Sequence, residues 1–333
     1  MATILDVAKE ANVSTATVSR VLNGSYSVTD EKKRRVMEAV EKVGYQIPNR
    51  LPLRKDGTPD LAGSKKIMLV ICSDYIDSIL HPFQQAAAQM GYCVTMAHYN
   101  GPDEFKQLTQ LIQTLSPVLA GILLLNCSDS SQAFQQLVGA FPLVQIGEAM
   151  MEHVPNRVVY NDEIKMGQDA ADYLIDRGHR KIGFLTSDSG HSAPLFSKQN
   201  RVNGYFLSLL AHQLPVDQSL VQGVDISIDG GYEGCKRLLE RHPDLDAIIG
   251  VTDVVSQGAL YAIRRATEIT QDIVVFSMDH NEVWDFTRPN FPYINPHHEE
   301  MGNAAAHVLH AAVLGELERD YTIIIRHTLE CVR

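Results

Sequence analysis

The hydrophobic pattern at the start of the chain predicts two short helices joined by a tight turn. Apolar residues recur at helical spacings within residues 4–11 and again within residues 15–22. Thr3, with Asp6 three residues later, forms a capping-box pattern that starts the first helix. Asn12 tolerates the left-handed backbone of a turn, so the second helix can begin soon after it.

A third helical pattern and a linker follow. Residues 29–43 open with acidic residues and carry an apolar stripe that includes Val36 and Val40. Within this helix, the run Lys32–Arg35 either contacts phosphates or forms an ordinary solvated face. Residues 45–64 then contain three prolines, two glycines and little periodicity, which is typical of a linker.

From residue 65 onward, short apolar runs alternate with amphipathic helical patterns. The predicted strands are 66–73, 93–99, 120–126, 142–147, 157–161, 181–187, 221–226, 247–252, 273–278 and 323–327. The clearest predicted helices are 103–115, 164–177, 197–213, 231–241, 256–266 and 299–316. Such alternation predicts parallel sheets covered by helices on both faces. A segment of this length divides naturally into two doubly wound lobes, with a ligand site where strand ends meet between them.

Charge is distributed unevenly along the 333 residues. The net charge is -11, but residues 1–66 contain 12 Lys and Arg against 8 Asp and Glu, a net +4 that leaves -15 for the remainder. Only the N-terminal segment is therefore suited to approach phosphates. The asymmetry suggests a small nucleic-acid reader attached to a large acidic sensor.

The composition narrows the class of protein further. The chain has no apolar run of about eighteen residues or more, and its N-terminus lacks a basic-then-apolar signal segment. We therefore expect a cytoplasmic protein that neither spans a membrane nor is secreted. The five cysteines show no paired spacing, so disulfides and a cysteine-based zinc site are not expected.

The second predicted helix has a small, polar face. This face is formed by Thr15, Ala16, Ser19 and Arg20. These side chains can approach a DNA groove without steric clash, and the fork of Arg20 matches the O6 and N7 atoms of guanine. This is the geometry of a helix-turn-helix recognition helix. The alternative is an ordinary helical bundle with a polar turn.

The letters of this segment resemble a known family signature. The run DVAKEANVSTATVSRVLNG is similar to the N-terminal signature of the LacI/GalR family of bacterial repressors, roughly DVAxxAxVSxxTVSRVLN. The resemblance implies that Thr15, Ala16 and Arg20 stand where the family reads bases. It implies phosphate contacts from Ser14, Thr17 and Asn23. Ser19, on the same polar helix face, and Thr3 complete the expected DNA-binding set for this segment.

The resemblance extends over almost the whole chain and implies a fold for the core. In this family the core has a periplasmic sugar-binding-protein fold whose chain crosses between two lobes three times. The segments YNDEIKMGQDAADYLIDRGHRKIGFL and RVNGYFLSLL resemble the family's second-lobe segments. We place the crossings near Tyr160, Pro289 and Asp320.

The predicted fold class is an all-α helix-turn-helix DNA-binding domain followed by an α/β core of two doubly wound parallel-sheet lobes. The predicted domains are 1–46 for the helix-turn-helix domain, 47–64 for the hinge or linker, and 65–333 for the effector-binding core. Within the core, the predicted N-lobe is about 65–159 and 290–319, and the predicted C-lobe is about 160–289 and 320–333.

Three polar residues stand at strand ends or helix starts of the expected ligand site. By resemblance, Arg201 matches the family's effector-contacting arginine and Asp279 matches the aspartate that binds ligand hydroxyls. Asp253 follows another apolar strand and either binds the effector or caps the next helix. Ile226 falls near the position where several family members present an aromatic ring, so a sugar is preferred over a stacked flat base. The loop SDYIDSILHPF after the first core strand is shorter than in the family.

The linker departs most from the family pattern. In the family, a short helix after a Y-x-P-N-like segment folds on operator DNA, and a leucine wedges into the minor groove. Pro52 disfavours a helix directly after that segment. The run TPDLAG favours instead a one-turn hinge at 59–62 with Leu61 as the wedge. The alternatives are no wedge at all, or a wedge from Leu51 or Leu53.

Motifs for catalysis and cofactors are not found in the sequence. It contains neither GxxxxGK[ST] nor GxGxxG after a strand, and no Ser/His/Asp set is identifiable from spacing. The histidines between His297 and His310 lack HExxH spacing, so a metal site is not expected. We expect no cofactor and no enzymatic activity.

The sequence therefore favours a homodimeric, sequence-specific transcriptional regulator, a repressor of a catabolic operon that binds an inverted-repeat operator in double-stranded DNA. A small effector, a sugar or a sugar phosphate bound between the lobes, switches its operator affinity. The alternative is a cytoplasmic small-molecule binding protein or sugar enzyme that does not act on DNA.

Overall fold

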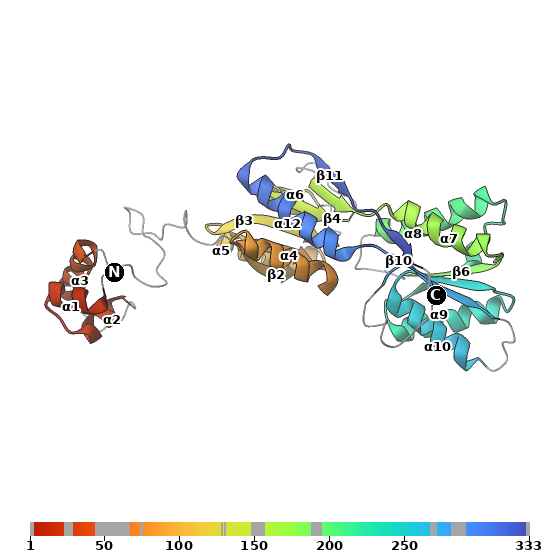
Figure 1. Cartoon of the computed structure of the whole chain (residues 1–333), viewed down its shortest axis with the longest axis horizontal. Coiled ribbons are helices and arrows are strands. Elements are labelled where there is room, and N and C mark those ends of the chain that lie inside the picture. Colours follow the sequence, from red (N-terminus) through yellow and green to blue (C-terminus); the bar gives the residue numbers. More distant parts are fainter. Residues whose placement is uncertain are drawn as a thin grey trace. The chain divides into compact units, whose positions relative to one another are not determined.

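The chain divides into two units, Met1–Ser64 and Lys65–Arg333 (Figure 1). Each unit has buried apolar clusters of its own. The computed structural model describes residues 3–22, 29–43, 67–73, 76–127, 129, 131–147, 157–187, 195–266, 272–280 and 291–330. The predicted linker, 47–64, lies outside these residues. Among them, no helix is both long and apolar enough to cross a membrane.

The described helices of the first unit are α1 Ile4–Ala11, α2 Thr15–Leu22 and α3 Asp30–Val43. The predicted capping box is confirmed, because the Asp6 amide donates to Thr3 Oγ1 at 3.4 Å and the Thr3 amide donates to the Asp6 carboxylate at 2.8 Å. Asn12 ends α1 in the left-handed conformation, with φ 51° and ψ 52°. Ser14 Oγ accepts from the Thr17 amide at 3.2 Å and so caps the start of α2.

These helices enclose a small apolar core. Its buried residues are Val7, Ala8, Ala11, Val18, Val21, Val36, Ala39 and Val40. Arg35 Nη2 donates to the Ala11 carbonyl at 2.6 Å, where a cation is favoured by the C-terminal end of α1. Within the run Lys32–Arg35, this arginine therefore serves the packing of α3 on α1.

The first lobe of the second unit is a six-stranded sheet in the order β11-β5-β4-β3-β1-β2, with every neighbouring pair parallel. Its strands are β1 Ile67–Cys72, β2 Cys93–His98, β3 Leu119–Leu125, β4 Leu143–Ile146, β5 Arg157–Tyr160 and β11 Tyr321–Ile324. Its helices are α4 Asp77–Gln89, η2 Pro102–Glu104, α5 Phe105–Leu115, α6 Gln132–Val138 and α12 His298–Leu314. Met68 and Val70 pack with α4 and α12, whereas Leu69 and Ile71 pack with α5 and α6. Successive residues of β1 thus meet opposite helix layers, as in a parallel sheet buried on both faces.

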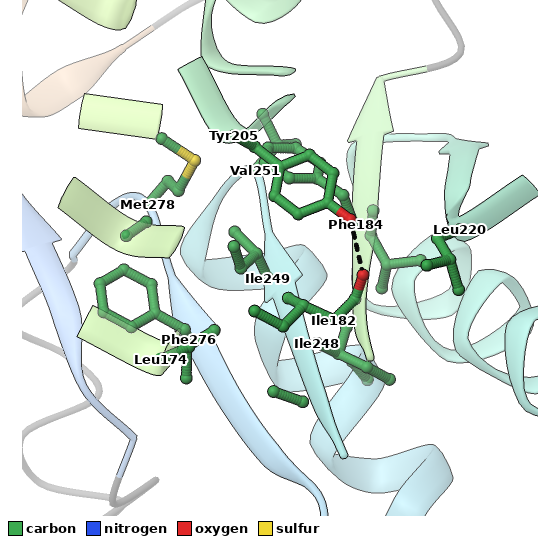
Figure 2. Close-up of a cluster of buried hydrophobic side chains, with 14 of the residues drawn as sticks. Leu174, Ile182, Phe184, Tyr205, Leu220, Ile248, Ile249, Val251, Phe276 and Met278 are labelled. Atoms are coloured by element: carbon green, nitrogen blue, oxygen red, sulfur yellow. Dashed lines mark hydrogen bonds between the residues drawn. The ribbon is translucent and has the colours of Figure 1, made fainter. Parts of the chain in front are cut away.

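The second lobe is another six-stranded sheet, in the order β12-β10-β9-β8-β6-β7. Its strands are β6 Ile182–Ser187, β7 Val221–Val224, β8 Ala247–Gly250, β9 Val274–Ser277, β10 Tyr293–Asn295 and β12 Thr328–Glu330. Its helices are α7 Glu163–Asp176, α8 Leu195–Ala211, η3 Gln218–Leu220, α9 Ile228–Arg241 and α10 Asp253–Arg265. Among the described strands of this sheet, only β12 runs antiparallel to its neighbour. Figure 2 shows the core, where the buried Tyr205 hydroxyl donates to the Ile182 carbonyl at 2.8 Å and so satisfies the polar atom of the ring.

Three crossovers join the lobes, and two of them lie later than predicted. Residues after Pro289 were assigned to the N-lobe, but Tyr293–Asn295 pairs with β9 and β12 in the second sheet. Residues after Asp320 were assigned to the C-lobe, but Tyr321–Ile324 pairs with β5 in the first sheet. Both errors have one cause, because strands of three and four residues carry too little hydrophobic pattern to reveal which sheet they join.

The sequence prediction also missed α4, where the segment SDYIDSILHPF was interpreted as a loop. Pro82 lies inside this helix and cannot donate an amide hydrogen bond, which weakens the helical pattern. The buried side chains of α4 nevertheless follow helical spacing and are Ile79, Leu80, Phe83, Ala86 and Ala87. Packing of this face against the sheet and α12 outweighs the lost hydrogen bond.

The three crossovers meet at the buried side chain of Asn161. Its Nδ2 atom donates to the Pro296 carbonyl at 3.0 Å and to the Ile325 carbonyl at 2.8 Å. Asn161 directly follows β5, Pro296 follows β10 and Ile325 follows β11. One amide therefore bonds the backbone of both other crossovers, and both of its N–H groups are used.

Two glycines bring α7 and α8 into close contact. A Cβ atom on Gly167 would lie 2.0 Å from the Arg201 carbonyl oxygen, and one on Gly204 would lie 2.0 Å from the Ile164 carbonyl oxygen. Each helix thus places a glycine against the backbone of the other, and the space between them is too small for a Cβ atom. This contact places the first turn of α7, which includes Glu163, beside Arg201 of α8.

We expect Gly167→Ala to lower the free energy of unfolding by about 1–3 kcal/mol, because the added methyl group overpacks a contact with backbone. Urea unfolding of the full-length protein, followed by circular dichroism, measures the change. Gln168→Ala, the next residue on α7, is the control and should change the free energy by about 0.5 kcal/mol or less. An unfolding midpoint of Gly167→Ala equal to that of the control would contradict the close packing.

Candidate functional site

The first candidate site is the start of α2. Ser14 and Thr15 are exposed, and Thr17 is half-buried. The hydroxyl oxygens of Ser14 and Thr17 are 2.9 Å apart, so two residues predicted to contact phosphates form a hydroxyl pair at the helix N-terminus. A helix N-terminus attracts anions through its backbone N–H groups and its dipole. This end of α2 is therefore suited to a phosphate of the DNA backbone.

The other predicted DNA contacts are described only in part. Those whose side chain or whole residue lies outside the described part of the chain are Ala16, Ser19, Arg20, Asn23 and Leu61. The first three of these belong to α2 by their backbone. Thr3 is committed to the cap of α1, where its hydroxyl donates to the Asp6 carboxylate at 2.7 Å.

The second candidate site is built around Arg201, at the carboxyl edge of the second sheet. Arg201 Nη1 donates to the Val251 carbonyl at 2.8 Å and to the Met278 carbonyl at 3.4 Å. Val251 directly follows β8 and Met278 directly follows β9, and both side chains lie in the core that Figure 2 shows. One guanidinium thus joins the ends of two central, parallel strands.

Glu163, which was not predicted from the sequence, is the charge partner of Arg201. The Arg201 Nε atom lies 2.5 Å from one Glu163 carboxylate oxygen, and Nη2 lies 3.4 Å from the other. Burial alone would lower the pKa of Arg201, but the charge and hydrogen bonds of Glu163, with the charge of Asp279, raise that pKa above its ordinary value. Arg201 is therefore a permanent cation. The only sequence signal for Glu163 was an acid in the first turn of a helix, which usually serves the helix dipole.

Asp279 lies beside Arg201, two residues after the end of β9. Its Oδ1 atom accepts from the His280 amide at 2.8 Å, and its carbonyl accepts from the Ser277 hydroxyl at 2.7 Å. These bonds fix the backbone that carries the carboxylate. The structure thus brings together Arg201 and Asp279, which the sequence assigned to one site.

Asp253 is the first residue of α10 and follows Val251 by two positions. The idea that Asp253 caps this helix is wrong, because Thr252 is the cap and its Oγ1 accepts from the Val255 amide at 3.5 Å. The carboxylate of Asp253 instead stands in the first turn, where the helix dipole favours negative charge. It lies at the same sheet edge as the carbonyl that Arg201 binds.

His298 connects this site with the first lobe. Its Nδ1 atom lies 3.9 Å from Asp279 Oδ1 and 3.0 Å from Ser78 Oγ. Ser78 belongs to α4 and His298 to the first turn of α12, which are both first-lobe helices. Sequence reasoning missed both residues, because only the packing of α4 against α12 brings Ser78 to His298, and only the contact between the lobes brings His298 to Asp279.

Two histidines of the segment around α12 are hydrogen-bonded to other side chains of the protein. His297 Nε2 is 3.1 Å from Thr328 Oγ1, and His310 Nδ1 is 2.8 Å from the Tyr92 hydroxyl. Across the described ranges, no group of three or more His, Cys, Asp or Glu side chains could hold a metal ion. Ile226, at the position discussed for an aromatic ring, is exposed and precedes the Ser227 cap of α9.

Comparison with known proteins matches both units to the same family. Residues 3–49 match the family described as bacterial regulatory proteins, lacI family. Residues 67–330 match the family described as periplasmic binding proteins and sugar binding domain of LacI family.

Similar proteins span most of the chain. The ribose operon repressor of Haemophilus influenzae is 28% identical over 98% of this chain and 97% of its own length. The transcriptional regulator MalR of Streptococcus pneumoniae is 29% identical over 83% of each chain. The solved structure of a transcriptional regulator CelR–cellobiose complex is 25% identical, with a TM-score of 0.70, and the match covers 99% of this chain and 98% of that chain. Taken with the capped three-helix unit and the two parallel-sheet lobes, these matches show that the chain belongs to the LacI family of bacterial regulatory proteins.

Proposed function

We propose that this protein is an effector-controlled transcriptional repressor that binds an inverted-repeat operator as a homodimer. The observation that carries the proposal is the α1–turn–α2 arrangement, in which Asn12 makes the left-handed turn and Ser14 caps the second helix. In such a motif the second helix enters the major groove. Arg20 then reads guanine, and Thr15 and Ala16 contact neighbouring bases.

The remaining contacts position the protein on the duplex. Ser14, Thr17, Asn23 and the start of α1 at Thr3 bind phosphates, which fix register without reading sequence. Leu61 wedges into the minor groove at the centre of the operator. A dimer two-fold axis matches the symmetry of the inverted repeat. The protein therefore acts in the cytoplasm, on the control region of a catabolic operon.

The effector is a sugar-like molecule bound between the lobes, and the protein binds it without converting it. Hydroxyl groups of a sugar can donate to Asp279 and Asp253 and accept from Arg201. The names of similar proteins mention ribose and cellobiose, which supports a carbohydrate. Ile226 offers no flat ring on which a purine could stack, so the class that we propose is a sugar or a sugar phosphate.

Selection of duplexes from a random pool tests the proposal as a whole. Full-length protein retains its preferred sequences, which are then sequenced and measured for affinity at several salt concentrations. We expect an inverted repeat whose affinity falls steeply with salt, and an isolated half-site that binds far more weakly. Retention of no duplex, or of all sequences equally, would leave a small-molecule binding protein as the function.

We expect Arg20→Ala to remove discrimination at one base pair in each half-site, at a cost of about 1–3 kcal/mol for the preferred base. Competition binding with operators altered at single positions measures this loss. Lys32→Ala removes an exposed cation of α3 and is the matched control, because any loss of affinity that it causes should be the same for all sequences. If Arg20→Ala also weakens every sequence equally, Arg20 binds phosphate and does not read a base.

We expect Asp279→Asn to abolish the response of operator binding to the sugar that stabilises the wild-type protein in a thermal-shift screen. The substitution removes a charge-assisted acceptor of hydroxyl groups, while operator affinity without sugar should stay within about three-fold of wild type. Calorimetry measures the affinity for the sugar, and operator binding with and without sugar measures the response. Asp272→Asn removes an exposed carboxylate before β9 and should respond as the wild type does. Unchanged sugar affinity in Asp279→Asn would place the site elsewhere.

A further inference from the structure

The charges around Arg201 narrow the class of effector. We infer that the site selects a hydroxyl-rich effector without negative charge and excludes sugar phosphates and other anions. This inference rests on the proposed function and decides between the two effector classes named there. It follows from the hydrogen bonds and charge partners that the Arg201 guanidinium already has within the protein.

Arg201 has one N–H group left for a ligand. Its guanidinium donates twice to Glu163, once to the Val251 carbonyl and once to the Met278 carbonyl. A guanidinium has five N–H groups, so these four bonds leave one within the described part of the chain. Arginine recognises phosphate and carboxylate best through two parallel N–H bonds, which Arg201 can no longer offer. A single hydroxyl oxygen needs only one.

The positive charge of Arg201 is also balanced before a ligand arrives. Arg201 and Glu163 are only 12% and 11% exposed, so water screens the pair weakly. Asp279 adds a second negative charge close to Arg201, and Asp253 adds a third at the same sheet edge. Lys165, on the first turns of α7, pairs within its own helix. Among the described residues, three carboxylates therefore stand against the one guanidinium of Arg201, with the imidazole of His298 3.9 Å from Asp279.

This charge balance separates the two effector classes. An anion at this edge would lose its hydration next to carboxylates, and its charge would find no free bidentate partner among the residues that the structure describes. A neutral sugar donates its hydroxyls to Asp279 and accepts from the remaining N–H group of Arg201. An amine-bearing sugar also fits, because a cation is attracted by the same carboxylates.

Glu163→Gln tests the inference, because it removes one negative charge and preserves the size of the side chain. Full-length wild type and variant are titrated calorimetrically with D-ribose, maltose, cellobiose, ribose 5-phosphate, glucose 6-phosphate and inorganic phosphate, with chloride at equal ionic strength as reference. We expect the wild type to bind none of the three phosphates. Glu163→Gln should bind at least one of them at least on the order of ten-fold more tightly than the weakest binding that the titration detects, since the charge of Arg201 is released. Glu240→Gln, exposed on α9, is the matched control and should behave as the wild type.

Asp279→Asn provides a second variant that leaves the α7–α8 contact intact, and it should gain phosphate affinity if Glu163→Gln does not fold. A folded Glu163→Gln without any gain, or a lack of gain in Asp279→Asn when only that variant folds, would overturn the inference. So would a sugar phosphate that binds the wild type and alters its operator affinity, although the proposed function would then stand. Failure of the proposed function shows separately, as a wild-type protein that selects no operator.

Discussion

The arrangement of the two lobes depends on the side-chain amide of Asn161. This amide donates to the carbonyls of Pro296 and Ile325, so all three crossovers are held at one buried point. Leaving either acceptor or the amide itself unpaired would cost about 1–3 kcal/mol for each buried group. The three residues joined by these hydrogen bonds lie directly after β5, β10 and β11, where the chain leaves one sheet for the other. The amide therefore sets the place where the lobes meet, and with it the placement of first-lobe His298 near second-lobe Asp279.

The chemistry of the proposed effector site is likewise set by packing before any ligand is present. Gly167 and Gly204 let α7 approach α8 closely enough for Glu163 to contact Arg201. A buried guanidinium without such a partner would be strongly destabilising. Arg201 thus joins the ends of β8 and β9, and the binding role that we propose for it is limited to the N–H group that these bonds leave free. This double use explains why the residue that matches the family's ligand-binding arginine is so little exposed.

The sequence predicted those features that local pattern controls. Alternating apolar strands and amphipathic helices revealed two parallel-sheet lobes, and Thr3 with Asp6 revealed the first cap, because these signals span only a few residues. The sequence prediction failed for features that depend on contacts between segments far apart in the chain. The three-residue strand β10 has a sheet partner but almost no pattern of its own, and Glu163 lies 38 residues from the arginine that it neutralises. Ser78 and His298 are 220 residues apart, so only the fold brings them together.

The order of the chain limits how an effector signal can reach the DNA-binding helices. The first lobe begins with β1, soon after the linker, whereas Arg201 and Asp279 belong to the second lobe. A ligand that touched only the second lobe would bind every arrangement of the lobes equally and could shift none of them. At the site that we propose, His298, bonded to Ser78 and 3.9 Å from Asp279, is the first-lobe group that would make binding depend on that arrangement. Regulation therefore requires that the effector contact both lobes. Any change that the effector makes in operator affinity must then appear equally as a change that the operator makes in effector affinity.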